Sequence, residues 1–357
     1  MKKLRIAVIG QGRSGRNIHG RFLKSESNIW FDVVAIVDGD AERRARALEE
    51  YPGCETFATY QELFGRTDID LVTNATYSDD HYSVTKDLLQ HGFNVLVEKP
   101  FARSFYECND LINTAKENNV TLAVFQQTFF APHYLKAIEV MNSGIIGDVK
   151  QVSIRYNGFS RRWDWQTLQH RLAGSLYNTG PHPVGMALGF LDYSEDLRIE
   201  YTKLDTTVLT AGDADDYAKI ILTAPGKPIV DLEISALDAF SDYNVKLQGT
   251  LGTYKANTTD YKMKYIVPGE NPEREALPNF ISDENGMPTF CKEELITHEE
   301  EGKIEGSAFD AAVKAFYTML YNKLTEGTPL TVTPEHAATI IQIIETAHAQ
   351  NPLPKKF

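Results

Sequence analysis

The stretch LRIAVIGQGRSG, residues 4–15, decides the fold of this chain. Its first half, Leu4–Ile9, is an apolar run of strand length, and Gly10, Gly12 and Gly15 follow it at the spacing G-x-G-x-x-G. Three glycines alone are weak evidence. A strand before them and a helix able to start at Ser14 make the pattern typical of the first turn of a doubly wound sheet.

The same turn is suited to a pyrophosphate. Gly10 permits the tight bend, Gly12 lets a phosphate approach the backbone, and Gly15 allows a helix to pack close to the strand. The next strand-like run ends at Asp38, whose carboxylate can accept hydrogen bonds from an adenosine ribose. The residues expected to hold a dinucleotide here are Gly10, Gly12, Arg13, Ser14, Gly15 and Asp38. A glycine turn in some other doubly wound protein is the alternative.

The residue types around Asp38 favour one cofactor. A carboxylate in this place repels a 2′-phosphate, so we expect NAD. Arg43 and Arg44 lie one helical turn further along and could offset the repulsion, which leaves NADP possible.

The first 125 residues alternate apolar strand runs with helical patterns, which predicts a parallel sheet with helices on both faces. We therefore expect an α/β Rossmann domain over residues 1–125. Its predicted strands are Leu4–Ile9, Phe31–Val37, Leu71–Ala75, Phe93–Val97 and Val120–Phe125.

Residues 126–357 are predicted to form an α+β domain for substrate binding and oligomerisation, built on a large open, mostly antiparallel sheet. Its predicted strands are Val149–Tyr156, Ile199–Leu209, Tyr217–Ala224, Lys227–Leu237 and Tyr243–Gly249. Residues 257–305 are polar and acidic and are interpreted as a long hairpin or arm, with a strand pair at Tyr261–Val267 and Phe290–Thr297. Helical spacing predicts two terminal helices, over residues 307–326 and 334–349.

Glu98-Lys99-Pro100 closes the apolar run Phe93–Val97. A lysine at the carboxyl end of a parallel strand, in a chain whose first turn can hold a pyrophosphate, lies where a nicotinamide ring would be bound. The third strand leads at the same edge into a segment that contains Thr76 and His81. His81 is either a residue over the nicotinamide end of the site or an exposed histidine at a helix start.

A third group of residues lies in the segment Gly174–Val184. Pro183 suits the first turn of a helix, so His182 is expected near a helix N-terminus, where the dipole lowers the pKa of an imidazole and keeps it neutral. Asn178, four residues earlier, is close enough to share a pocket with His182 or else caps the turn before Pro181.

Taken together, the glycine motif with His19, the Glu98-Lys99-Pro100 motif and the run that ends in Gly180-x-His182 resemble the Gfo/Idh/MocA oxidoreductases. The resemblance implies a nicotinamide-linked reaction on a sugar or polyol, with Lys99 and His182 as the catalytic lysine and histidine. Asn178 stands where many members have aspartate, and Gln126 begins a segment where members often have arginine.

The residues expected to contact substrate include Lys99, Asn178 and His182. Arg162, Trp163 and Trp165 join them, because tryptophan faces suit sugar C–H groups and arginine can bind hydroxyls or a sugar acid. An aromatic core cluster with a salt bridge is the alternative for these last three.

We therefore expect an NAD(P)-dependent oxidoreductase that acts on a sugar, polyol or sugar-acid hydroxyl or carbonyl. His182 would take the hydroxyl proton, Lys99 would stabilise charge on the same oxygen, and Asn178 would orient Lys99 or the substrate. Two alternatives stay open: a glycosidase that uses NAD for transient oxidation, and a non-catalytic nucleotide-binding regulator.

The composition limits the kinds of partner that the protein is expected to bind. A formal net charge of −13 argues against nucleic acid and anionic membranes, and no apolar run reaches the length of a membrane span. Three scattered cysteines indicate no disulfide framework or metal site, and a cytoplasmic protein is expected. We also expect a homodimer or homotetramer through the second-domain sheet, whose outer face is predicted to be rich in aromatic and β-branched residues.

Overall fold

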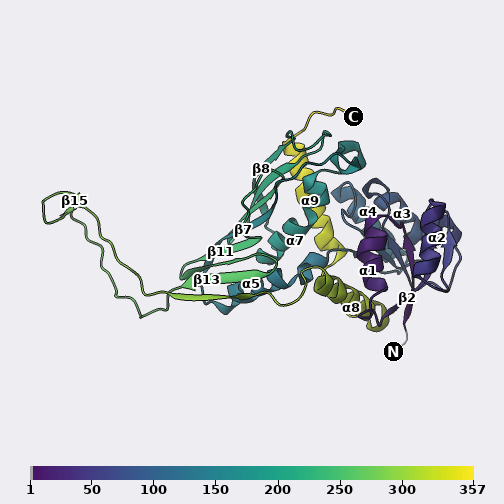
Figure 1. Cartoon of the computed structure of the whole chain (residues 1–357), viewed down its shortest axis with the longest axis horizontal. Coiled ribbons are helices and arrows are strands. Elements are labelled where there is room, and N and C mark those ends of the chain that lie inside the picture. The colour runs from purple at the N-terminus through teal and green to yellow at the C-terminus, as the bar shows by residue number, and fades with distance from the viewer. Residues whose placement is uncertain (1–2) are drawn as a thin grey trace.

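The structure is a computed structural model that describes residues 3–357. It contains two large sheets, and a long narrow arm projects from the edge of the second (Figure 1). The amino-terminal sheet lies with its helices at one end of the molecule, and the arm extends from the opposite end.

The first sheet is entirely parallel, with strand order β3-β2-β1-β4-β5-β6. Its strands are β1 (Leu4–Ile9), β2 (Phe31–Val37), β3 (Glu55–Phe57), β4 (Leu71–Asn74), β5 (Val95–Val97) and β6 (Leu122–Val124). The order reverses between β1 and β4. A crevice therefore opens at the carboxyl ends of these two strands, which is the usual ligand position in such sheets.

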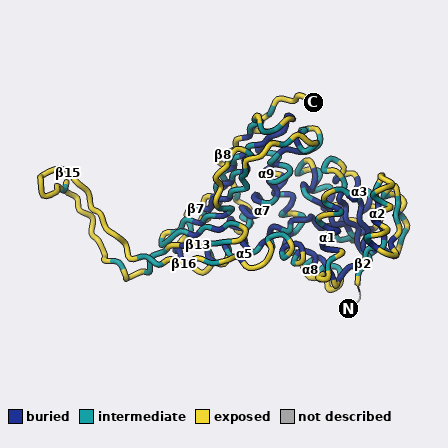
Figure 2. The backbone as a smooth tube through the Cα atoms, viewed as in Figure 1, coloured by how far each residue is buried: buried dark blue, intermediate teal, exposed yellow. Residues whose placement is uncertain are grey.

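Helices cover both faces of this sheet, as its apolar strands require (Figure 2). The helices of this half are α1 (Gly20–Leu23), α2 (Ala41–Glu50), α3 (His81–Gln90) and α4 (Phe105–Glu117). Ile6 and Val8 of β1 pack towards the side of α1 and α2, whereas Ala7 and Ile9 pack towards α3 and α4. Because successive side chains of a strand point to opposite faces of the sheet, β1 contributes to two separate cores.

The second sheet has strand order β16-β13-β12-β11-β7-β10-β9-β8, and every pairing except β7–β10 is antiparallel. Its strands are β7 (Val149–Asn157), β8 (Arg198–Asp205), β9 (Tyr217–Thr223), β10 (Ile229–Ser235), β11 (Val245–Gly249), β12 (Gly252–Ala256), β13 (Asp260–Tyr265) and β16 (His298–Lys303). Both predicted fold classes are therefore confirmed.

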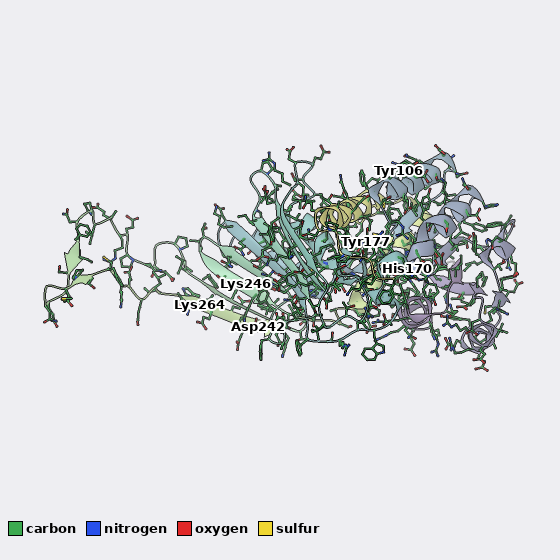
Figure 3. All side chains as sticks on the ribbon, turned by 90° about the horizontal axis from the view of Figure 1, so that it is seen from above. Tyr106, His170, Tyr177, Asp242, Lys246 and Lys264 are labelled. Atoms are coloured by element: carbon green, nitrogen blue, oxygen red, sulfur yellow. The ribbon has the colours of Figure 1, made fainter. Side chains whose placement is uncertain are left out.

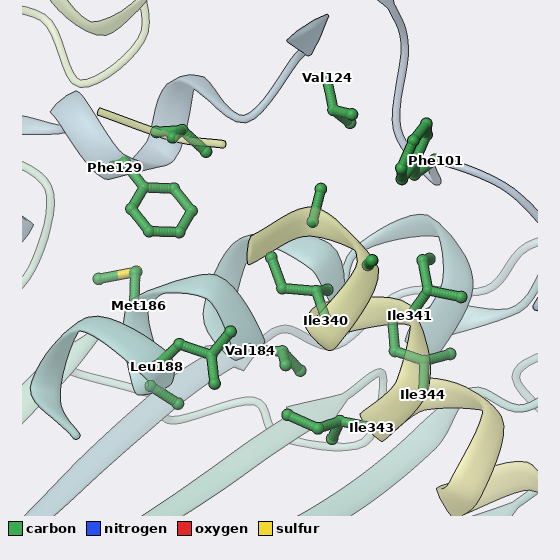
Figure 4. Close-up of a cluster of buried hydrophobic side chains, with 14 of the residues drawn as sticks. Phe101, Val124, Phe129, Val184, Met186, Leu188, Ile340, Ile341, Ile343 and Ile344 are labelled. Atoms are coloured by element: carbon green, nitrogen blue, oxygen red, sulfur yellow. The ribbon is translucent and has the colours of Figure 1, made fainter. Parts of the chain in front are cut away.

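One face of the second sheet is covered by α5 (Pro132–Ser143), α7 (Pro181–Phe190) and α9 (Pro334–Gln350). Figure 4 shows isoleucines of α9, among them Ile340 and Ile344, packed near Val184 and Leu188 of α7 and Phe129. Because α9 also packs on α4, this core joins the two halves of the chain. The opposite, outer face carries mainly charged and polar side chains rather than the expected aromatic and β-branched ones.

Two details of the predicted strands are wrong. Phe290–Thr297 is not a strand: β13 pairs instead with β16, and the arm between them holds only the two-residue strands β14 (Ile281–Ser282) and β15 (Pro288–Thr289). The prediction also missed β3 and β12, which are too short or too polar to give a clear apolar pattern.

The first terminal helix, α8 (Asp310–Glu326), follows the second sheet in sequence but packs on the first. Val313, Phe316 and Leu320 are buried against the face that also holds Ile6 and Val8. The proposed domain boundary at residue 125 stays a prediction. Helix α8 belongs to the second predicted domain by sequence but packs on the sheet of the first. Within the described residues, no helix combines the length and apolar character needed to cross a membrane.

If α8 is an integral part of the first core, Phe316→Ala should lower the free energy of unfolding by about 3–5 kcal/mol, because it removes a fully buried ring. Urea denaturation followed by fluorescence measures the change. Lys314→Ala, on the exposed side of the same helix, is the matched control and should change stability by less than about 0.5 kcal/mol. Equal effects of the two substitutions would contradict this packing.

Candidate functional site

The glycine turn after β1 has the shape that a pyrophosphate requires. Gly10 has φ +89°, and a Cβ there would lie 2.4 Å from the carbonyl oxygen of Ala75, while a Cβ on Gly15 would lie 1.7 Å from the carbonyl oxygen of Gly10. Gly12, in contrast, has only an Arg43 side-chain nitrogen at 4.0 Å. Side chains are thus excluded where the backbone is crowded, and the space beside Gly12 stays open to a phosphate.

Asp38 lies directly after β2, beside this turn. Its carboxylate accepts hydrogen bonds from the backbone N–H groups of Gln11 (2.7 Å) and Asp40 (2.9 Å), which fix its orientation. Arg43 lies 3.5 Å from the same carboxylate, whereas Arg44 donates to the backbone carbonyls of residues 38 and 39. Only Arg43 is therefore in a position to affect a group bound at Asp38.

A cleft of about 550 Å³ runs from this turn to the meeting point of the two sheets. The first half of the chain contributes most of its walls, and the second half contributes Trp165, Gln166 and Asn178. The sequence-predicted residues that line it are Gly10, Gly12, Arg13, Ser14, Asp38, Thr76, His81, Glu98, Lys99, Trp165 and Asn178. Gly15 lies below the turn, packed against Gly10.

Below the cleft, a buried carboxylate lies beside a buried histidine. Glu98 is 2% exposed, and its Oε1 lies 3.1 Å from Nε2 of the fully buried His19, whose Nδ1 is 2.7 Å from the hydroxyl of Tyr317 in α8. Burial raises the pKa of Glu98, but the His19 interaction and the charge of Lys99 outweigh it, so the net pKa is lowered. Glu98 therefore stays ionised and ties β5 to the turn after Gly15.

Lys99 projects into the cleft from the end of β5. Its Nζ donates a 2.8 Å hydrogen bond to the backbone carbonyl of Asn178, and its own N–H donates to Glu98 Oε2 at 3.0 Å. Burial lowers the pKa of Lys99, the Glu98 charge opposes this, and Arg13 and Arg162 lower it further. The net direction is down, because burial penalises the charged ammonium more than the Glu98 charge favours it.

His182 lies in the first turn of α7, as predicted. Its Nδ1 is 2.5 Å from Thr128 Oγ1, and burial together with the Lys99 charge lowers its pKa to about 3. His182 is therefore neutral at physiological pH and close enough to Lys99 to sense its charge. Thr128 was not predicted, although it follows the carboxyl end of β6, the sheet edge where ligands collect.

Asn178 reaches Lys99 through its backbone, while its side-chain Oδ1 accepts a 3.2 Å hydrogen bond from Gln166. Asn178 ends the short helix α6 (Ser175–Asn178), and the buried Asp215 anchors that helix by accepting from the N–H of Leu176 at 2.7 Å. Gln166 and Asp215 were both missed, because only the folded chain brings them next to Asn178.

His81 is not the exposed histidine that one alternative suggested, since it is 2% exposed. Its Nδ1 lies 2.7 Å from the Pro100 carbonyl and its Nε2 lies 3.3 Å from that of Thr76, and burial lowers its pKa. His81 thus joins the loops after β4 and β5 at the cleft edge. Gln126, also buried, does not line the cleft.

The predicted substrate residues separate into two places. Trp165 lines the cleft and meets Tyr77 edge to face, with ring centroids 5.3 Å apart. Arg162 lines an adjoining cavity of about 400 Å³, together with Asn157 and Gln166, and lies 3.2 Å from Asp164. Trp163 is 77% exposed and lines neither cavity.

A salt bridge that was not predicted lies beside the cleft. Arg171 contacts Asp79 at 2.7 Å and lies over the ring of Tyr77. It joins the segment after β7 to the loop after β4. In residues 3–357, no group of three His, Cys, Asp or Glu side chains is arranged to hold a metal ion.

Comparison with known proteins agrees with this architecture. A model described as the oxidoreductase family with an NAD-binding Rossmann fold matches residues 4–126, and the GFO/IDH/MocA C-terminal domain matches residues 134–255. The uncharacterized oxidoreductase C26H5.09c of Schizosaccharomyces pombe is 31% identical over 193 residues, which are 53% of this chain and 52% of that protein. The chain thus matches about half the length of this relative.

Other relatives match over nearly their whole length. The uncharacterized oxidoreductase YhhX of Escherichia coli is 23% identical over 97% of this chain and 96% of its own. A crystal structure of a probable oxidoreductase yhhX has a TM-score of 0.78 at 20% identity, covering 98% of both chains. The scyllo-inositol 2-dehydrogenase (NADP(+)) IolW of Bacillus subtilis is 22% identical over 96% of this chain and 92% of its own.

The first family model covers the glycine turn, and the second covers most strands of the second sheet. Together they span well over half of the sequence. The chain therefore belongs to the Gfo/Idh/MocA family of oxidoreductases, with an NAD-binding Rossmann fold.

Proposed function

We propose that the protein is a nicotinamide-dependent dehydrogenase that acts on a hydroxyl or carbonyl of a sugar, polyol or sugar acid. The observation that carries the proposal is the setting of Lys99. It lies on the floor of the dinucleotide cleft, where the two sheets meet, with a lowered pKa and with neutral His182 nearby. A nucleotide-binding regulator would have no use for such a pair.

The cleft fits a dinucleotide, because side chains are excluded at Gly10 and Gly15 and space is free at Gly12. Gly12, Arg13 and Ser14 would hold the pyrophosphate, and Asp38 would accept hydrogen bonds from the adenosine ribose. A bound nicotinamide supplies the hydride chemistry.

The task of the chain's own residues is to handle the proton of the reacting hydroxyl. A base with a pKa of about 3, as for His182, is weak at neutral pH, whereas the lowered pKa of Lys99 raises the share of its amine that is neutral and able to accept a proton. We assign proton removal to Lys99. With Nδ1–H donating to Thr128 Oγ1, His182 would keep Nε2 free to accept a hydrogen bond from the same hydroxyl.

A substrate rich in hydroxyl groups is supported by unpaired acceptors in the adjoining cavity. Asn157 Oδ1, Gln166 Oε1 and Asp215 Oδ1 are buried and have no hydrogen-bond partner among the described residues. Buried acceptors without donors are costly, and sugar or polyol hydroxyls would satisfy them. Arg162 in the same wall would suit a sugar acid.

A reducing cytoplasmic setting is part of the same proposal. Cys54 and Cys108 are buried free thiols, and Cys291 is an exposed one. Free thiols are usual where no oxidising compartment has to be withstood.

The proposed activity predicts NADH formation when the protein is screened with NAD against sugars, polyols, sugar acids and aryl glycosides. Lys99→Met should lower kcat on the best substrate by about 10²–10⁴-fold, because it removes the base but keeps the stem of the side chain. His182→Ala should leave measurable turnover. Release of aglycone without net NADH would instead indicate a glycosidase, and intact NAD binding with no turnover on any substrate would count against an enzyme.

Asn178→Asp offers a test of the Lys99 assignment. A carboxylate at residue 178 favours the protonated form of Lys99 and raises its pKa, so the pH at which kcat/KM for oxidation reaches its plateau should move upward. Asn178→Ala keeps the backbone carbonyl and adds no charge, so its profile should stay near that of the unaltered protein. Identical profiles for the two variants, with NAD binding retained, would remove Lys99 from the role of base.

Cofactor choice should follow Asp38. NADP would lose contacts with this carboxylate and meet its charge, so NAD should bind more tightly by about 1–3 kcal/mol, which calorimetric titration of both oxidised cofactors measures. Arg43→Ala should weaken any residual NADP binding, whereas Arg44→Ala, whose side chain holds backbone carbonyls, tests only the local fold. Tighter binding of NADP would show that Arg43 outweighs Asp38.

A further inference from the structure

Helix α6 carries the carbonyl that accepts from Lys99, yet it is too short to hold its own position. It has only 4 residues, and isolated helices of this length are not stable in water. Its N-cap residue is Gly174, which has no side chain to accept from the first N–H groups of the helix. The position of the Asn178 carbonyl therefore depends on contacts from other parts of the chain.

Asp215, just before β9, supplies the missing cap. Its Oδ2 accepts a 2.7 Å hydrogen bond from the N–H of Leu176, and its backbone carbonyl accepts one of 2.8 Å from the N–H of Ser175. The carboxylate also lies so close to Gly174 that a Cβ there would be 2.3 Å from Oδ1. The start of α6 is thus fixed by one buried residue that lies 39 positions from Leu176 in the sequence.

Tyr177 provides a second set of contacts, near the other end of α6. Its hydroxyl donates a 3.0 Å hydrogen bond to the backbone carbonyl of Arg103, in the loop between β5 and α4 that also contains Lys99. Its ring is stacked on that of His348 in α9, with centroids 4.8 Å apart and an interplanar angle of 15°. Figure 3 shows Tyr177 between the second sheet and the helices of the first half. Tyr177 therefore joins α6 to the loop after β5 and to α9.

These contacts bear on the reaction because α6 covers Lys99. The Lys99 Nζ lies 2.8 Å from the Asn178 carbonyl oxygen, so α6 is part of what separates the amine from water. Burial is the largest cause of the lowered pKa of Lys99. A displaced α6 would admit water and weaken this effect, and the pKa of Lys99 would rise towards its ordinary value.

We propose that Asp215 and Tyr177 are positioning residues for the proton transfer assigned to Lys99. Both act through α6: Asp215 fixes its start, and Tyr177 fixes it against the loop that carries Lys99. This role rests on the proposed function, in which Lys99 removes the proton. The environment of the Lys99 amine can nevertheless be measured without any turnover.

Three substitutions separate the cap from other effects. Asp215→Ala removes the capping acceptor, Asp215→Asn keeps an acceptor oxygen without the charge, and Tyr177→Phe removes only the hydroxyl bonded to the loop after β5. Tyr106→Phe, at an exposed tyrosine of α4 that is labelled in Figure 3, is the matched control. In substrate-free protein, acylation of Lys99 by an amine-specific reagent, followed over a range of pH, reports the pKa of its amine.

We expect Asp215→Ala and Tyr177→Phe to raise the pH of half-maximal labelling of Lys99 by about 0.5 unit or more, because α6 then covers the amine less well. The value of kcat should fall about 10–100-fold in the same variants while NAD binds as before, since a displaced base affects the rate rather than cofactor affinity. Asp215→Asn and Tyr106→Phe should stay near the unaltered protein in both measurements.

The labelling and the kinetics can fail separately. A labelling shift in a protein without turnover would support the positioning role and count against the proposed function. An unchanged labelling midpoint in Tyr177→Phe and in folded Asp215→Ala would overturn the positioning role, as would equal shifts in Asp215→Ala and Asp215→Asn. If circular dichroism shows that Asp215→Ala does not fold, the comparison of Tyr177→Phe with Tyr106→Phe decides alone.

Discussion

The buried pair between Glu98 and His19 is the interaction on which the site depends. A carboxylate that is 2% exposed is tolerated only with charged or hydrogen-bonded partners, and His19 supplies one at 3.1 Å. Because His19 follows the glycine turn and Glu98 precedes Lys99, the pair fixes the pyrophosphate end of the cleft relative to the reactive end. Tyr317, bonded to His19, brings α8 into the same arrangement. Removal of the His19 side chain would leave the Glu98 carboxylate buried without this partner.

Local sequence pattern was enough to predict the features that depend on near neighbours. β1 and β2 were predicted with correct bounds, because an apolar strand and its flanking turn residues lie within a few positions of each other. The packing of α8 on the first sheet was not foreseen, since nothing in its helical spacing says which sheet it covers. The strand predicted at Phe290–Thr297 failed for a related reason: apolar residues at both ends of this segment suggested a strand, but β13 pairs with the charged β16.

Some residues of the site could likewise be predicted from local sequence pattern, and others could not. Lys99 could be placed because the carboxyl ends of parallel strands meet at one edge of a sheet, and His182 because Pro183 indicates a helix start. The contacts of Thr128 with His182 and of Gln166 with Asn178 join segments that only the fold brings together. Asn178 was expected to act through its side chain, yet its backbone carbonyl holds Lys99, a role that any residue could fill. The amide side chain of Asn178 carries no charge, whereas an aspartate at this position would place a negative charge beside Lys99.

We propose that Lys99 acts as a base because its ammonium group is buried against a carbonyl rather than paired with a carboxylate. Its reactivity can be measured directly by pulse labelling with an amine-specific acylating reagent at a series of pH values, with each lysine quantified by mass spectrometry. Exposed Lys314 serves as the reference within the same sample. We expect the labelling of Lys99, corrected for its lower accessibility, to reach half of its maximum at a lower pH than that of Lys314. A midpoint equal to or above that of Lys314 would contradict the account.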